Sequence, residues 1–251
     1  MNDARRSYER HIAPFARPFA ESTCRRAAPA LLRGGHVLDH GAGTGLVTSL
    51  LLRRQPDLHV VALDPNADLL SALNDEGRCI RVVGTAAALH CDRPPFGAVV
   101  SNLVLPFCPD AAGDLAHIRQ FTAGNLVATT LGEVADVTPF HRFWSATKTV
   151  IPEAWEPSDY PHHRFGDADA FVDEITRGGW TVRSVHEVHA VRRISAPNAW
   201  TWLSSVLPVG VGDGYRSMSD DERACVRTEF LDRWSDKSRW VSGGWTVVAT
   251  A

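Results

Sequence analysis

The chain has 251 residues, of which 44% are hydrophobic and 22% are charged, and its formal net charge is -3 at pH 7. This length can bury the core of one large α/β domain without a metal or a disulfide to hold it. The charged residues are mixed along a slightly acidic chain, which argues against a nucleic-acid partner and favours a small or neutral one.

The cysteine pattern and the lengths of the apolar runs indicate in which cellular compartment the protein works. The five cysteines are an odd number without a C-x-x-C pair, so we expect reduced thiols in a cytoplasmic enzyme. The first ten residues are polar, and no apolar run reaches the length of a membrane span, so we expect neither a signal peptide nor a membrane partner. The sequence leaves the oligomeric state open between a monomer and a homodimer.

The first half of the chain alternates apolar strands with helices. An N-terminal helical segment, 1–35, is expected to be broken by Pro14, Pro18 and Pro29. Strands are predicted at 36–39, 59–63, 79–83, 98–103 and 125–130, with helices at 44–54, 66–73 and 110–121. This alternation is typical of βαβ units and predicts an α/β fold with a doubly wound parallel sheet.

The alternation of strands and helices ends after residue 131. Residues 132–166 are rich in aromatics, histidines and prolines without a clear period, and order is predicted to resume with a helix at 168–177. A strand at 180–191, helices at 199–206 and 220–234 and a last strand at 244–249 follow. We treat 1–251 as a single domain in which 132–166 and 197–240 are candidate lid or substrate segments, the alternative being surface decoration.

A glycine-rich turn follows the first predicted strand, where residues 37–45 read VLDHGAGTG. Glycine permits positive φ and lets a ligand approach the backbone. The spacing is G-x-G-x-G and differs from the G-x-G-x-x-G of dinucleotide sites. The preceding Asp39 would repel a pyrophosphate, but it suits the ammonium of S-adenosylmethionine, which has no phosphate. Asp64 ends the next strand, where a carboxylate can accept both ribose hydroxyls.

Three segments carry a resemblance to a known family. Residues 37–45 resemble motif I of class I S-adenosylmethionine-dependent methyltransferases, 64–70 are similar to the acidic loop and helix that follow it, and 96–105 resemble the fourth-strand motif. The resemblance runs from about residue 8 to the C-terminus and is most specific over 37–110. It implies a Rossmann-like, three-layer α/β/α fold whose seven-strand sheet has an antiparallel last strand.

The resemblance also implies a set of cofactor-binding residues. These are the acids, turn residues and strand ends Asp39, Gly41, Ala42, Gly43, Gly45, Asp64, Pro65, Thr85, Ala86, Ser101 and Asn102. Thr85 stands where many relatives carry an adenine-binding Asp, so its hydroxyl or a backbone carbonyl is expected to take that role.

The acceptor is less constrained by these motifs. The segment after the fourth strand lacks the paired prolines of enzymes that methylate base or glutamine amino groups. This favours a small-molecule acceptor, as in bacterial secondary metabolism.

Methyl transfer from a sulfonium is an in-line displacement in which the enzyme mainly supplies position. A hydroxyl or acidic carbon acceptor would gain from a base, for which the first lid segment offers His141, Tyr160, His162 and His163. An amine that arrives neutral would need none. We expect no metal, because His162 and His163 have no carboxylate or thiol at ligand spacing. His186 and His189 are expected on opposite sides of a strand and cannot share an ion.

Two other functions stay open. One is a methyltransferase-like fold that uses S-adenosylmethionine without methyl transfer, as a cyclase, a decarboxylase or a binding subunit. The other is a nicotinamide-dependent oxidoreductase, against which the glycine spacing and Asp39 argue.

Overall fold

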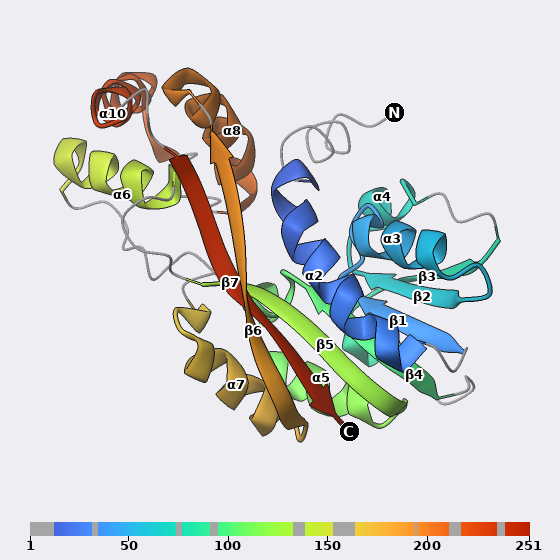
Figure 1. Cartoon of the computed structure of the whole chain (residues 1–251). Coiled ribbons are helices and arrows are strands. Elements are labelled where there is room, and N and C mark those ends of the chain that lie inside the picture. Colours follow the sequence, from blue (N-terminus) through green and yellow to red (C-terminus); the bar gives the residue numbers. More distant parts are fainter. Residues whose placement is uncertain are drawn as a thin grey trace.

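The computed structural model describes residues 13–31, 35–73, 77–90, 95–132, 139–152, 164–193, 195–210, 217–234 and 239–251. They contain one seven-stranded sheet with the strand order β3-β2-β1-β4-β5-β7-β6 (Figure 1). The strands are β1 (His36–His40), β2 (His59–Asp64), β3 (Cys79–Val83), β4 (Phe96–Asn102), β5 (Thr122–Gly132), β6 (Thr181–Arg193) and β7 (Arg239–Thr250).

The strand directions confirm the expected sheet. Strands β1 to β5 pair in parallel, whereas β7 pairs antiparallel with both β5 and β6. The sequence order reverses at β1, which lies between β2 and β4. In open α/β sheets, ligands bind outside the carboxyl ends of the strands at such a reversal. The sheet topology therefore marks the carboxyl ends of β1 and β4 before any side chain is considered.

Helices cover both faces of the sheet and make three layers (Figure 1). The helices that do so are α2 (Ala13–Leu31), α3 (Leu46–Arg54), α4 (Ala67–Leu70), α5 (Ala111–Arg119) and α7 (Ala168–Arg177). Successive strand side chains point to opposite faces. Val37 accordingly packs in the core under α2 and α3, and Leu38 packs in the core under α5 and α7. The Rossmann-like, three-layer expectation is confirmed.

A further helical layer lies beyond one end of the sheet, above the upper ends of β6 and β7 in Figure 1. It consists of α6 (Pro139–Val150), α8 (Ala196–Gly210) and α10 (Asp220–Asp232). These helices share one apolar core, to which they contribute Phe143, Trp202 and Phe230. The core extends to α2, whose Phe15 ring centroid lies 5.4 Å from that of Trp202. The two candidate lid segments thus pack together at the carboxyl edge of β5 and β6.

Several predicted boundaries were wrong. The prolines do not break the N-terminal helix, because α2 runs through Pro18 and Pro29 while its apolar face packs on the sheet. Residues 132–166 are not irregular throughout, because α6 lies within them. Its buried Phe143, Ala146 and Thr147 follow a helical spacing, which the mixture of aromatic and polar residues concealed.

Other elements differ in length from the prediction. Helix α4 ends at Leu70 because the N–H groups of Ala72 and Leu73 donate to carbonyls three residues back, as in a 3₁₀ turn. Strands β5 and β7 are longer than expected, and α8 begins at Ala196 with Pro197 in its first turn. None of the helices in the described parts of the chain combines the length and the apolar character that a bilayer crossing demands.

Candidate functional site

The glycine turn between β1 and α3 has the backbone conformation that its sequence predicts. Gly41, Gly43 and Gly45 have φ values of 71°, 55° and 84°, a region that residues with a Cβ rarely adopt. The N–H groups of Gly41 and Ala42 donate to the Leu63 carbonyl at 2.8 and 3.0 Å. These two bonds hold the turn at the end of β1 against the end of β2.

Asp64 links that turn to the loop after β2. Its Oδ2 accepts from the Gly43 N–H at 2.9 Å, and its Oδ1 accepts from the Asn66 N–H at 2.8 Å. The side chain is buried, with 8% of the residue exposed. An ionised carboxylate has about four acceptor sites, so two bonds leave capacity for ligand hydroxyls. The exposed Pro65 follows it in the same loop.

Asp39 points to the first turn of α3. Its Oδ2 accepts from the backbone N–H and the hydroxyl of Thr48, at 3.0 and 2.6 Å. This satisfies one of the N–H groups that a helix start leaves without a partner. Burial raises the pKa of Asp39 to about 7, although the Thr48 bonds act in the opposite direction. Asp39 is therefore a capping residue of α3, and its expected contact with an ammonium stays a prediction.

The predicted adenine region follows β3. Gly84 donates from its N–H to the Asp64 carbonyl at 3.1 Å, so this turn lies beside the ribose candidate. Thr85 is exposed, and the buried Ala86 begins the 3₁₀ turn η2 (Ala86–Ala88). The structure thus brings Asp64 and Thr85 to the same edge of the sheet, although they are distant in sequence.

The end of β4 completes this edge. Ser101 is fully buried, and its Oγ lies 3.3 Å from Nδ1 of His40, so it faces β1. Burial lowers the pKa of His40 to about 4, which keeps its ring neutral. Asn102 is half-buried, and its Oδ1 accepts from the Thr23 hydroxyl of α2 at 3.2 Å.

The turn after β4 lies within the segment 96–105 that resembles the fourth-strand motif, but its left-handed conformation was not predicted from the sequence. Leu103 has a φ of 61°, which is rare for a residue with a Cβ. The following Val104 side chain lies against Gly41, where an added Cβ would come within 2.2 Å of its Cγ2. A strained residue directly after a strand, at the reversal of the strand order, is a feature of functional sites. Only the backbone angles reveal it.

The four candidate bases are not placed by the structure. Position 141 lies in α6, but the His141 side chain lies outside the described part of the chain, as do Tyr160, His162 and His163 entirely. Their roles stay predictions.

Comparisons with known proteins match this architecture. A family model described as "Methyltransferase domain" matches residues 37–123. Malonyl-[acyl-carrier protein] O-methyltransferase of Halorhodospira halophila is 30% identical over 150 residues, which cover 53% of this chain and 51% of that protein. Magnesium-protoporphyrin O-methyltransferase of Rhodobacter capsulatus is 29% identical over 163 residues, covering 60% and 70% respectively. The chain thus matches about half the length of the first relative.

Another relative and a solved structure also match the chain. Ribosomal RNA small subunit methyltransferase C of Shewanella pealeana is 30% identical over 123 residues, covering 40% of this chain and 36% of that protein. A solved structure from Bacillus halodurans, described as a methyltransferase, superimposes with a TM-score of 0.60 at 14% identity, over 92% of this chain and 97% of the other. The turn, the sheet order and these matches agree: residues 37–123 match the methyltransferase domain model, and the chain has the fold of class I S-adenosylmethionine-dependent methyltransferases.

Proposed function

We propose that the protein transfers the methyl group of S-adenosylmethionine to an oxygen atom of a small-molecule acceptor. The observation that carries the proposal is the positive-φ glycine turn joined to Asp64, which fits a phosphate-free nucleoside. Two relatives are named as O-methyltransferases, and this supports oxygen as the acceptor atom.

The cofactor residues divide by position. The turn Gly41–Gly45, including Ala42, would pass beneath the cofactor, because a Cβ at its positive-φ positions would fill the space or strain the backbone. Asp64 would accept from the ribose hydroxyls, and Pro65 would support its loop. Thr85 and Ala86 would lie near adenine. Two side chains would hold the end of β4 beside the cofactor. Asn102 would do so through its hydrogen bond with Thr23 of α2, and Ser101 through its hydrogen bond with His40.

When bound, S-adenosylmethionine would supply an electrophilic methyl group for in-line attack by the acceptor atom, with the sulfur leaving as a neutral thioether. The protein's task is then to align the acceptor and exclude water. A carboxylate oxygen has no proton to lose and needs no base. A hydroxyl would lose its proton to a base in the lid, for which His141, Tyr160, His162 and His163 stay the candidates.

The helical layer of α6, α8 and α10 would hold the acceptor. It lies at the carboxyl edge of the sheet, on the same side as the turn. The half-buried Trp200 packs among aromatic rings there, 5.5 Å from Phe230 and 6.2 Å from Phe143 between centroids. Such a lining favours an apolar or aromatic acceptor. In contrast, Trp144 is buried in the same core and is unavailable for stacking.

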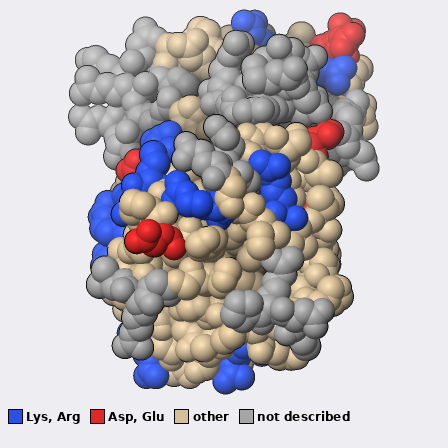
Figure 2. Space-filling model, turned by 90° about the vertical axis from the view of Figure 1, so that its right-hand side faces the viewer, with Lys and Arg blue, Asp and Glu red and all other residues tan. Residues whose placement is uncertain are grey.

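RNA is the alternative acceptor class to a small molecule. Figure 2 shows one face on which Lys and Arg side chains gather near the middle with fewer acidic ones among them. One relative is named as a ribosomal RNA methyltransferase. The chain as a whole is nevertheless acidic, with a net charge of -3, which favours the small molecule.

The test is methyl transfer by the purified chain from methyl-labelled S-adenosylmethionine to a panel of carboxylic acids, phenols, amines and ribosomal RNA. S-adenosylhomocysteine formed only with an oxygen acceptor would support the proposal. Transfer to RNA alone would contradict it. Tight cofactor binding without any S-adenosylhomocysteine would favour a cyclase, a decarboxylase or a binding subunit, and selective binding of a nicotinamide cofactor would favour an oxidoreductase.

A further inference from the structure

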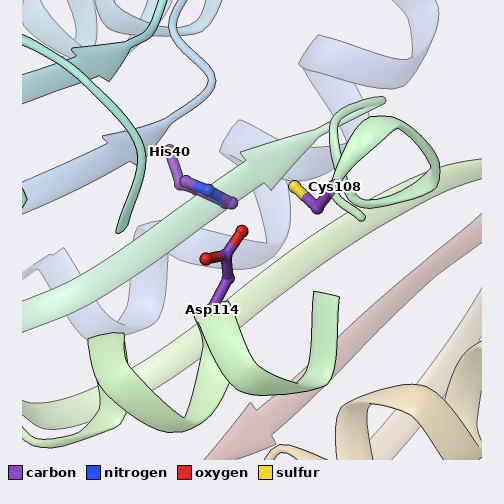
Figure 3. A group of neighbouring side chains, drawn as sticks. All are labelled: His40, Cys108 and Asp114. Carbon is purple, nitrogen blue, oxygen red and sulfur yellow. The ribbon is translucent and has the colours of Figure 1, made fainter. Parts of the chain in front are cut away.

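Three side chains of different elements meet beneath the end of β4. They are His40 at the end of β1, Cys108 after the 3₁₀ turn η3 (Leu105–Phe107), and Asp114 on α5. Figure 3 shows the three side chains pointing toward one another in the space between the sheet and α5. One donor atom from each lies within 4.8 Å of the others. None of the predicted cofactor contacts uses this cluster.

We propose that His40, Cys108 and Asp114 bind a divalent cation, and that Zn²⁺ is the ion their chemistry fits. An imidazole, a thiolate and a carboxylate are the ligand types that Zn²⁺ takes, whereas Mg²⁺ and Ca²⁺ take oxygen ligands. Three protein ligands would leave a fourth position for water or another ligand. The sequence predicted no metal on the basis of its histidine spacings. The three residues of this cluster lie too far apart in the chain to form a ligand motif.

The distances are close to those that an ion requires. In a tetrahedral zinc site the bonds are about 2.0–2.3 Å long, which places the donor atoms roughly 3.3–3.7 Å apart. The present donor atoms, all within 4.8 Å of one another, would close by up to about 1.5 Å. Cys108 lies in a turn, and the Asp114 side chain is only half-buried, so side-chain rotation can supply this movement.

The surroundings of His40 suit a ligand. In the tautomer that carries its proton on Nδ1, the ring donates to Ser101 Oγ at 3.3 Å and offers its Nε2 lone pair to a cation. A histidine ligand commonly has such a partner on its other nitrogen, which fixes the ring orientation. Ser101 is fully buried, so this partner is itself held in place.

The charges also balance. A divalent cation with one thiolate, one carboxylate and a neutral imidazole has a net charge of zero, so the ion can be bound in this partly buried site. Binding breaks the Cys108 S–H bond and releases that proton to solvent as the Zn–S bond forms. No electron is transferred.

The alternative is a metal-free hydrogen-bonded cluster. The Cys108 thiol donates to the Val104 carbonyl over 3.7 Å, and it also hydrogen-bonds the Asp114 side chain. Both states would join β1 to α5 beside the glycine turn. They differ in whether the full chain takes up an ion with these three ligands, and this can be measured without any methyl acceptor.

The experiment is to strip the full-length chain of metal with a chelator and titrate it with zinc chloride by calorimetry. Cobalt chloride in place of zinc provides a second readout, because a cobalt–thiolate bond gives a charge-transfer band in the near ultraviolet. We expect one equivalent of either ion, and a rise in melting temperature with zinc. Cys108→Ser should abolish the cobalt band and weaken zinc binding at least about 100-fold, and Asp114→Asn should weaken it at least about tenfold.

The exposed thiol Cys225 provides the matched control, since Cys225→Ser should bind both ions as the wild type does. Circular dichroism checks that each variant is folded. If a variant fails to fold, the wild-type stoichiometry and its zinc-dependent melting temperature still decide the matter. Absence of stoichiometric binding to the wild type, or a cobalt band that persists in Cys108→Ser, would overturn the proposal in favour of the metal-free cluster.

Discussion

The Asp64 carboxylate accepts a hydrogen bond from the backbone N–H of Gly43, 2.9 Å away. The acid that ends β2 and the turn that ends β1 are therefore one connected unit, which the Gly41 and Ala42 bonds to Leu63 reinforce. A site whose parts fix one another loses less entropy when a ligand binds. The following predictions begin from this link.

Replacing Asp64 by Ala should weaken S-adenosylmethionine binding by about 1–3 kcal/mol, because charge-assisted bonds to the ribose are lost. Asp64→Asn, which keeps one acceptor oxygen without the charge, should lie between the wild type and Asp64→Ala. Isothermal titration calorimetry measures both. The exposed Asp68 on the neighbouring α4 gives the control, and Asp68→Ala should bind normally. Equal affinity in all four proteins would remove Asp64 from the ribose site.

Gly41→Ala should destabilise the fold for two separable reasons. The φ of 71° is unfavourable for alanine by about 1–2 kcal/mol. The new Cβ would also overlap Val104, at a cost of about 1–3 kcal/mol. Val104→Ala removes the two Cγ contacts but leaves its Cβ 2.9 Å from the added atom. Urea unfolding of the single and double variants should therefore show that Val104→Ala restores most of the second part and leaves the first. If Val104→Ala restores nothing, the overlap is not a source of the loss.

Gly43→Val tests whether the cofactor approaches the backbone of the glycine turn. Its φ of 55° is unfavourable for a branched side chain, and a side chain here would keep a ligand from approaching the backbone. We expect a folded protein by circular dichroism that no longer binds S-adenosylmethionine in calorimetry. Normal affinity in the folded variant would show that the cofactor does not approach this residue.

Thr129 lies in a chain of buried hydroxyls that joins α2 to the sheet. Its Oγ1 is 2.7 Å from that of Thr23 and 3.0 Å from that of Thr246. Thr129→Val should lower the free energy of unfolding by about 1–3 kcal/mol, because two buried hydroxyls lose a partner. Urea unfolding measures this. Thr228→Val, on the exposed side of α10, should change stability by less than about 0.5 kcal/mol, and an equal loss there would contradict the assignment.

Glu174 anchors α7 to α5 with a buried carboxylate. It accepts from the Ala112 N–H and from Arg164, both at 3.0 Å, and it also pairs with Arg177. Both arginines are partly exposed, so solvent screens the pairs. Glu174→Gln should therefore cost only about 1–2 kcal/mol in urea unfolding. The exposed neighbour Asp173 supplies the control, and if Asp173→Asn cost as much, the loss could not be assigned to the buried contacts.

Local patterns predicted most of the sheet and failed where packing overruled them. The apolar runs before Gly41 and before Pro65 were recognised because buried parallel strands are continuously hydrophobic. Helix α2 passes through Pro18 and Pro29, which a local rule forbids, because its apolar face is held against the sheet. Helix α6 was missed since its buried residues pack against α8 and α10, which no local window includes.

The sequence by itself determined the glycine turn, the two acids and the alternation of strands with helices, because each depends on residues that are neighbours in the chain. Tertiary structure alone decided that Asp39 caps α3 through Thr48. It also decided that the lid segments form one layer and that His40, Cys108 and Asp114 meet beneath β4. These contacts depend on which strands are neighbours and on which face each side chain points to. Both are set by the packing of the whole sheet.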